Sequence, residues 1–136
     1  MHTLEQNYKG FNSISPQNIT SATTTNGASV DTKELGDDLM VVLSLGTLTG
    51  SHTIDVKLQD SADDSTFADI SGATFPQITE SADDTVAALK LNLEGLNRFI
   101  RVVSVTAGTV TASNISAAVL VKAVRGSAAL NSTTPA

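Results

Sequence analysis

The chain has 136 residues, no cysteine and a net charge of −6. This length fits one domain whose core folds without cross-links, and the lack of cysteine excludes disulfides and thiolate metal sites. The negative charge argues against nucleic-acid binding, which needs clustered Lys and Arg to neutralise phosphates. Because there is no run of about 18 apolar residues and no basic cluster before an apolar run at the start, neither a membrane span nor a signal peptide is expected.

The charges are distributed unevenly along the chain. Residues 31–94 hold 13 acidic and three basic residues, whereas residues 95–136 hold four basic residues and no acidic one. Either acidic loops and basic strand ends neutralise each other within one fold, or the two kinds of charge meet between subunits. Under the second interpretation, Arg98 and Arg101 are assembly contacts.

Residues 1–27 are polar and rich in Ser and Thr, with scattered apolar residues. They are expected to lie outside the folded body, either as a disordered tail or as an extended arm that becomes ordered on a partner. The arm hypothesis assigns further assembly contacts to four apolar side chains, those of Tyr8, Phe11, Ile14 and Ile19.

The next part of the chain consists of short apolar runs separated by turn residues. Residues 39–45 are apolar almost throughout, which predicts a strand that is covered on both faces and ends at the glycines of residues 46–50. In the following segment, Ile54, Val56 and Leu58 alternate with polar residues, which predicts a half-buried strand with these side chains in the core. A turn rich in Asp and Ser then leads into a second strand, so the unit is predicted to be a β-hairpin.

Three further runs complete the predicted body. Residues 85–93 alternate, with Leu89, Leu91 and Leu93 expected to point inward. Residues 98–105 are β-branched and aromatic and are predicted to form a strand that stops at Ala107 and Gly108. Residues 115–124 are apolar on both faces, which is typical of a central strand.

Together these runs predict about six to eight strands and no convincing helix. The predicted fold class is therefore all-β: an antiparallel β-sandwich, jelly-roll or Ig-like, with an extended N-terminal arm. The predicted organisation is the arm at residues 1–27, the β-sandwich domain at residues 28–125 and a flexible C-terminal tail at residues 126–136.

The sequence SADDS at residues 61–65 recurs as SADDT at residues 81–85. If both turns lay at one end of the sandwich, their carboxylates would offer the oxygen ligands that Ca²⁺ prefers. The spacing, however, lacks the alternating acids and the final Glu of an EF-hand loop. Because Asp and Ser are favoured in turns for local hydrogen bonding, we expect solvated turns and no metal.

No residue pattern supports catalysis. His2 and His52 are the only histidines and stand far apart in the sequence, so a histidine metal site is not expected. No nucleophile motif and no Gly-rich phosphate loop occurs. The sequence therefore predicts no catalytic residue and no cofactor, and a protein that is not an enzyme.

The hairpin segment carries a family resemblance. Residues 54–70 read IDVKLQDSADDSTFADI, followed by RFIRVV at residues 98–103 and an Ala-rich last strand. This order resembles the small β-sandwich proteins of tailed bacteriophages that decorate the head or serve as minor capsid proteins. Related sequences often carry Gly where this chain has Asp64, so the turn is expected to differ here.

The resemblance implies a capsid decoration (cement) protein that binds the outer surface of a phage head and stabilises it. It implies the major capsid protein as partner, a homo-oligomer with a trimer favoured, and a place on the capsid surface of the virion after synthesis in the host cytoplasm. Neither nucleic acid nor a membrane is an expected partner. The alternative is a tail- or fibre-associated adhesion module that binds a host surface glycan, although the body has few aromatic rings on which a sugar could stack.

Overall fold

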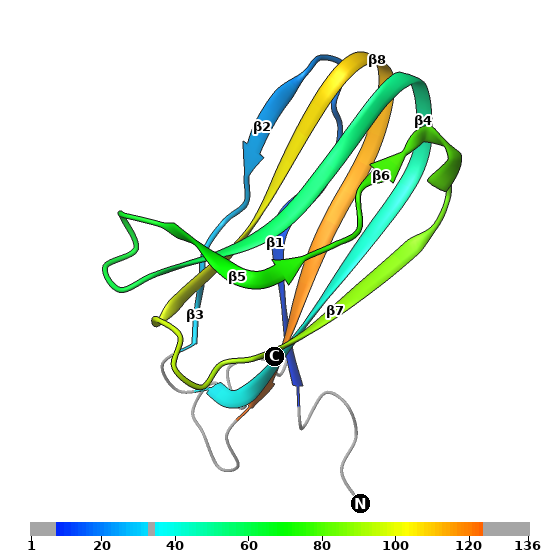
Figure 1. Cartoon of the computed structure of the whole chain (residues 1–136). Coiled ribbons are helices and arrows are strands. Elements are labelled where there is room, and N and C mark those ends of the chain that lie inside the picture. Colours follow the sequence, from blue (N-terminus) through cyan, green and yellow to red (C-terminus); the bar gives the residue numbers. More distant parts are fainter. Residues whose placement is uncertain (1–7, 33–34, 124–136) are drawn as a thin grey trace, which may run out of the picture.

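The structure, a computed structural model, describes residues 8–32 and 35–123 (Figure 1). These residues form eight β-strands and one short 3₁₀-helix, and every strand pairing among them is antiparallel. The predicted all-β fold is therefore confirmed. The elements are β1 (Tyr8–Asn18), β2 (Thr23–Asn26), β3 (Val30–Asp31), β4 (Leu35–Ser61), β5 (Ala68–Thr74), β6 (Ile78–Thr79), η1 (Glu80–Ala82), β7 (Val86–Asn92) and β8 (Phe99–Ala123).

Two long strands organise the fold. β4 and β8 pair with each other almost from end to end, from Leu35 opposite Ala123 to Ser61 opposite Phe99. Figure 1 shows both strands curving over together at the top of the molecule, so each contributes one half to each of two sheets. The pairing register shifts at this bend, between Leu45 and Leu48. Such irregularities are how strands pass from one sheet of a sandwich to the other.

Glycines permit the bend. Gly50 and Gly108 have φ values of 109° and 104°, in the region that side chains rarely adopt. A Cβ on Gly108 would also lie 2.6 Å from the carbonyl oxygen of Ser51, so the two strands approach too closely there for a side chain. The prediction that strands end at residues 46–50 and at Ala107 and Gly108 is wrong, because these residues bend continuous strands.

The strand order is that of a jelly roll. In sheet 1, β1 pairs with the second half of β8, which pairs with the first half of β4, which pairs with β7. In sheet 2, β2 and β3 pair with the first half of β8, whose partner, the second half of β4, pairs with β5 and β6. Each layer thus has four strand positions, because β2 and β3 share one edge of sheet 2 and β5 and β6 share the other. Two such layers define the jelly-roll form of the sandwich, one of the two forms expected. The predicted hairpin corresponds to β4 and β5.

The core lies between the two sheets and is mainly aliphatic. Ile54, Val56 and Leu58 are fully buried in it, as the alternating pattern predicts. Leu89 and Leu91 face the core but are only half-buried, because β7 is the last strand of sheet 1. The same core cluster includes residues of both sheets, among them Leu39, Val41, Leu43, Ile115, Ala117 and Val119 from sheet 1 and Ile100 and Val102 from sheet 2.

The polar N-terminal segment belongs to the sandwich. β1 pairs with β8, from Tyr8 opposite Lys122 to Asn18 opposite Asn114, and β2 pairs with the other half of the same strand. The expectation of an arm outside the body is therefore wrong for residues 8–27. The polar composition is compatible with a strand because Ser and Thr are tolerated where one face meets solvent. Residues 1–7 and the predicted tail at residues 126–136 lie outside the described residues.

Candidate functional site

The apolar residues assigned to assembly lie largely inside the protein. Ile14 is 1% exposed, Ile19 is also buried, and both belong to the core. Phe11 is half-buried and packs against the same core. The backbone of Tyr8 pairs in sheet 1, while its side chain lies outside the described part of the structure. Ile14 and Ile19 stabilise the fold and present no surface to a partner.

The two arginines assigned to assembly both bind groups of their own chain. Arg98 donates two hydrogen bonds to the carboxylate of Asp31, from Nε at 2.7 Å and from Nη2 at 2.6 Å. Its guanidinium also lies 5.0 Å from the ring centroid of Phe99. An acid of the acidic segment thus neutralises a base of the basic segment within one fold, as the first interpretation of the charge pattern expects. About 45% of the Arg98 side chain stays exposed.

Arg101 belongs to a polar network on the outer face of sheet 2. Its Nε and Nη2 donate to the side-chain oxygen of Gln59, at 3.0 and 2.8 Å, and its guanidinium lies 4.0 Å from the ring centroid of Phe67. The amide of Gln59 donates onward to Asp69, which also pairs with Lys57 at 3.0 Å. These hydrogen bonds, that of Gln59 first, lower the pKa of Asp69. The network ties β5 to β4 and β8.

The two acidic turns lie at different ends of the sandwich. The turn at residues 61–65 follows the end of β4, where Ser61 is opposite Phe99. The turn at residues 81–85 lies at the bend, where the Asp83 carboxylate accepts a hydrogen bond from the backbone N–H of Leu48. Figure 1 shows the loop between β4 and β5 and the η1 segment on opposite sides of the molecule. The idea that the turns share one end is therefore wrong, and their carboxylates do not come together.

Local hydrogen bonds account for the sequence of the first turn. Asp63 Oδ1 accepts from the Ser61 hydroxyl at 2.9 Å and from the backbone N–H groups of Ser65 and Thr66 at 3.0 and 2.9 Å. These bonds lower the pKa of Asp63. Asp64 has a φ of 59°, a conformation that favours Gly and that Asp tolerates, and Asp84 has the same conformation in the second turn. Asp at position 64 thus adopts the backbone conformation in which Gly is the usual residue.

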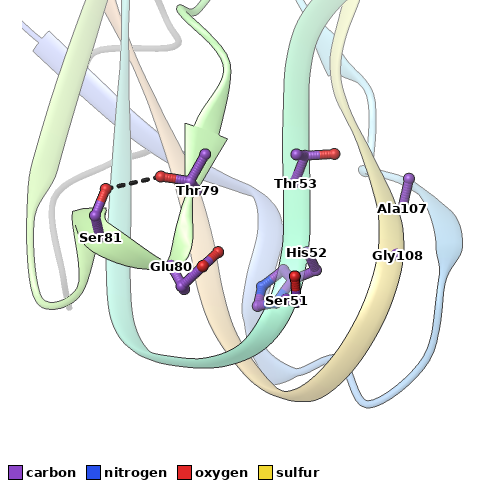
Figure 2. Close-up of a pocket in the computed structure, with 8 residues that line it drawn as sticks. All are labelled: Ser51, His52, Thr53, Thr79, Glu80, Ser81, Ala107 and Gly108. Carbon is purple, nitrogen blue, oxygen red and sulfur yellow. Dashed lines mark hydrogen bonds between the residues drawn. The ribbon is translucent and has the colours of Figure 1, made fainter.

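A pocket of about 550 Å³ opens at the bend (Figure 2). One wall of the pocket is formed by η1 and the end of β6, and the other by the bends of β4 and β8. His52 is 3% exposed, and neither of its ring nitrogens has a hydrogen-bond partner among the described residues. Figure 2 shows the Glu80 side chain extending from η1 toward the side of β4 on which the imidazole lies. The lining residues are Ser51, His52, Thr53, Thr79, Glu80, Ser81, Ala107 and Gly108.

Two further buried polar groups, outside the pocket lining, lack hydrogen-bond partners among the described residues. The hydroxyls of Ser104 and Thr106, on the same inner face of sheet 2 as His52, are buried and unpaired within the described chain. Thr79 and Ser81, in contrast, share a hydrogen bond of 2.7 Å at the rim. Buried polar atoms normally find a partner, whether protein, water or ligand. The even spacing of His52 with Ile54, Val56 and Leu58 already places its side chain on the inner face of the sheet.

The outer face of sheet 1 carries apolar side chains that the described chain does not cover. Met40 is 41% exposed and Val86 is 67% exposed, and Val42 between them is half-buried. Val42 lies opposite Ala88 on one side and Ala118 on the other, so the apolar surface continues across three strands. The prediction that residues 39–45 are covered on both faces is therefore wrong within the described part of the chain.

Residues 8–32 and 35–123 contain neither a metal-ligand cluster nor a membrane helix. No group of three or more His, Cys, Asp or Glu side chains in these ranges is arranged to hold a metal ion. The same ranges contain no helix that is long and apolar enough to cross a membrane.

Comparison with known proteins identifies similar folds. No protein-family model and no curated sequence matches the chain. Among solved structures, SPBc2 prophage-derived protein YomS is similar, with a TM-score of 0.53 and 11% identity over 85% of this chain and 93% of that one. A chain in the structure of infectious bursal disease virus, Gx strain, is similar with a TM-score of 0.50 and 14% identity, over 85% of this chain and 32% of that one. At these identities the likeness concerns the fold, which this chain shares with a prophage-derived protein and with part of a viral one.

Proposed function

We propose that this protein is a structural component of a phage virion and, within the virion, a decoration protein on the outer surface of the capsid. The observation that carries the proposal is the fold: a jelly roll similar to a prophage-derived protein over nearly the whole of that chain. The similarity to part of a chain from a virus structure points to the same class of protein. The resemblance of residues 52–105 to phage head proteins supports the finer assignment.

The architecture suits this role physically. β4 and β8 run continuously through both sheets, so their hydrogen bonds tie the two layers into one unit. A rigid unit present in many copies stabilises a shell through the sum of modest contacts, each of which is weak alone. In this proposal the partner is the major capsid protein, the protein is not an enzyme, and its place is the capsid surface after synthesis in the host cytoplasm. Arg98 remains a proposed contact, because much of its side chain is exposed.

Copurification tests the proposal. Intact particles of the phage that encodes the chain would be purified, and the protein would be quantified relative to the major capsid protein by mass spectrometry. A decoration protein is expected in a fixed, high copy number on heads that carry no tail. Its absence from tailless heads, or a presence of only a few copies per particle, would contradict the assignment to the capsid surface.

A second candidate function has one specific observation in its favour. A tail- or fibre-associated adhesion module needs a site for a host surface glycan, and the pocket at the bend presents hydroxyls of Thr79 and Ser81 next to the Glu80 carboxylate and His52. Hydroxyl and carboxylate groups are suitable partners for sugar hydroxyls. NMR titration of the full chain with host wall glycans tests this candidate. Saturable shifts at His52 that are lost in Glu80→Gln would favour adhesion over decoration.

A further inference from the structure

Sheet 1 ends in an unpaired strand. Within the described residues, β7 pairs with β4 alone, so its other edge is open. The opposite edge of the sheet, β1, is irregular: it contains Pro16, and its register shifts on both sides of Ile14. Proline and bulges protect an edge strand from pairing with another chain. β7 is regular over seven residues and contains no proline, so it lacks this protection.

The backbone groups at the open edge can be assigned. Leu45 N–H donates to the carbonyl of Thr85, so Thr85 and every second residue after it turn their N–H and C=O groups toward β4. The residues between them, Val86, Ala88 and Lys90, therefore direct their N–H and C=O groups to the open edge. Their side chains lie on the outer face and are exposed. A partner strand has three consecutive donor and acceptor pairs available there.

Both faces of β7 would gain burial from a partner strand. On the inner face, Leu89 and Leu91 pack against the core but remain half-buried. On the outer face, Val86 and Ala88 continue the apolar surface formed by Met40 and Val42. A strand added at this edge would cover the exposed sides of the leucines and extend the apolar surface. Burial of apolar area is favourable, at about 25 cal/mol per Å².

The two ends of β7 carry opposite charges, so two copies of the strand that pair antiparallel would bring opposite charges together. Asp83 and Asp84 precede the strand, and Lys90 lies in its second half. In an antiparallel pair of identical strands, the start of one meets the end of the other. A pairing of Val86 with Ala88 of the second copy brings the turn that carries Asp84 of each copy close to Lys90 of the other, once at each end. Neither side chain forms a hydrogen bond or ion pair within the described chain, so both are available.

We propose that two copies of this chain associate through β7, paired antiparallel about a twofold axis, to join their two copies of sheet 1 into one continuous sheet. The contact is isologous, meaning that the same strand serves on both sides. This inference does not depend on the proposed capsid function. The family resemblance implies a trimer, whereas pairing through β7 gives a dimer. The mass of the assembled species therefore distinguishes the two.

Sedimentation of the full chain over a range of concentrations measures the association. A species of twice the 14.0 kDa chain mass is expected at micromolar concentrations. Ala88→Pro removes an N–H from the open edge and none from the pairing with β4, so this variant is expected to remain folded by circular dichroism and to be monomeric. A wild-type chain that stays monomeric up to hundreds of micromolar, or a trimer that Ala88→Pro does not dissociate, would overturn the proposal.

A charge exchange tests the antiparallel geometry itself. Lys90→Glu and Asp84→Lys each convert two opposite-charge pairs into two like-charge pairs in their own dimers, so each is expected to weaken association about tenfold or more. In an equimolar mixture, a dimer of one variant with the other regains both opposite-charge pairs. The mixture is therefore expected to associate about as tightly as the wild type. Failure of the mixture to associate more tightly than either variant alone would contradict the proposed pairing.

Discussion

The hydroxyl of Ser13 accepts a hydrogen bond from the backbone N–H of Val102 at 3.0 Å and donates one to the carbonyl of Ala28 at 2.8 Å. Ser13 is buried between two segments that lie far apart in the sequence. A backbone hydrogen bond next to Ser13 joins the same two segments: Gly27 N–H donates to the Val102 carbonyl at 2.7 Å. A residue of the polar N-terminal segment thus satisfies the backbone of a central strand, so this segment is a structural part of the jelly roll.

Truncation of Ile14 tests whether the N-terminal segment belongs to the core. Ile14 is 1% exposed within the core, so Ile14→Ala is expected to lower the free energy of unfolding by about 2 to 5 kcal/mol. Ser15, its exposed neighbour, supplies the matched control, and Ser15→Ala is expected to change stability by less than about 0.5 kcal/mol. Urea unfolding of both variants measures the difference. Equal stability of the two would indicate that β1 does not belong to the core in solution.

The glycines of the fold provide a second test, with a control inside the same chain. Gly108 and Gly72 both have positive φ, at 104° and 78°, but only at Gly108 would an added Cβ meet atoms of another strand. Gly72→Ala is expected to cost about 1 kcal/mol, because only the backbone conformation opposes the side chain. Gly108→Ala is expected to cost several times more, because its Cβ would lie 2.6 Å from the Ser51 carbonyl oxygen. Thermal unfolding compares them, and similar losses would argue against the close approach of β4 and β8.

Acid stability tests the turn at Asp63. Hydrogen bonds from the Thr66 backbone N–H, the Ser61 hydroxyl and the Ser65 backbone N–H lower the pKa of Asp63 in the folded chain. Between this lowered pKa and the ordinary value of about 4, the unfolded chain binds more protons. The stabilisation is therefore present above about pH 4 and is lost as the pH falls through the folded-state pKa. Urea unfolding at stepwise pH is expected to show a shallower loss for Asp63→Ala than for the wild type, and parallel curves would contradict this.

Sequence patterns anticipate the fold where they are local. The alternation of Ile54, Val56 and Leu58 correctly predicts an inner face, because neighbouring residues of a strand point to opposite sides. The glycine-containing bends do not follow from the local pattern, which predicts strand ends there, since the same residue type permits a turn, a bulge or a close approach. Which of these occurs at Gly108 depends on Ser51, a partner far away in the sequence.

The roles of the candidate site residues are also hard to predict from the sequence, because they too depend on partners far away in the chain. Ile14 and Ile19 look isolated among polar residues in the sequence, and only the pairing of β1 with β8 shows that they face the core. Arg98 and Arg101 look unpaired until Asp31 and Gln59 are brought next to them by the strand order. The choice between jelly-roll and Ig-like topologies likewise depends on long-range pairing, which residue periodicity does not encode.

The most direct measurement of the central claim is reconstitution on heads. Purified protein would be titrated onto undecorated heads of the phage that encodes it, and the bound copies would be counted after sedimentation. Heads that are already decorated serve as the control. The proposal predicts saturation at a fixed ratio to the major capsid protein, heads that resist heating better once bound, and no further uptake by decorated heads. Failure of the protein to sediment with undecorated heads at any concentration would contradict the proposed function.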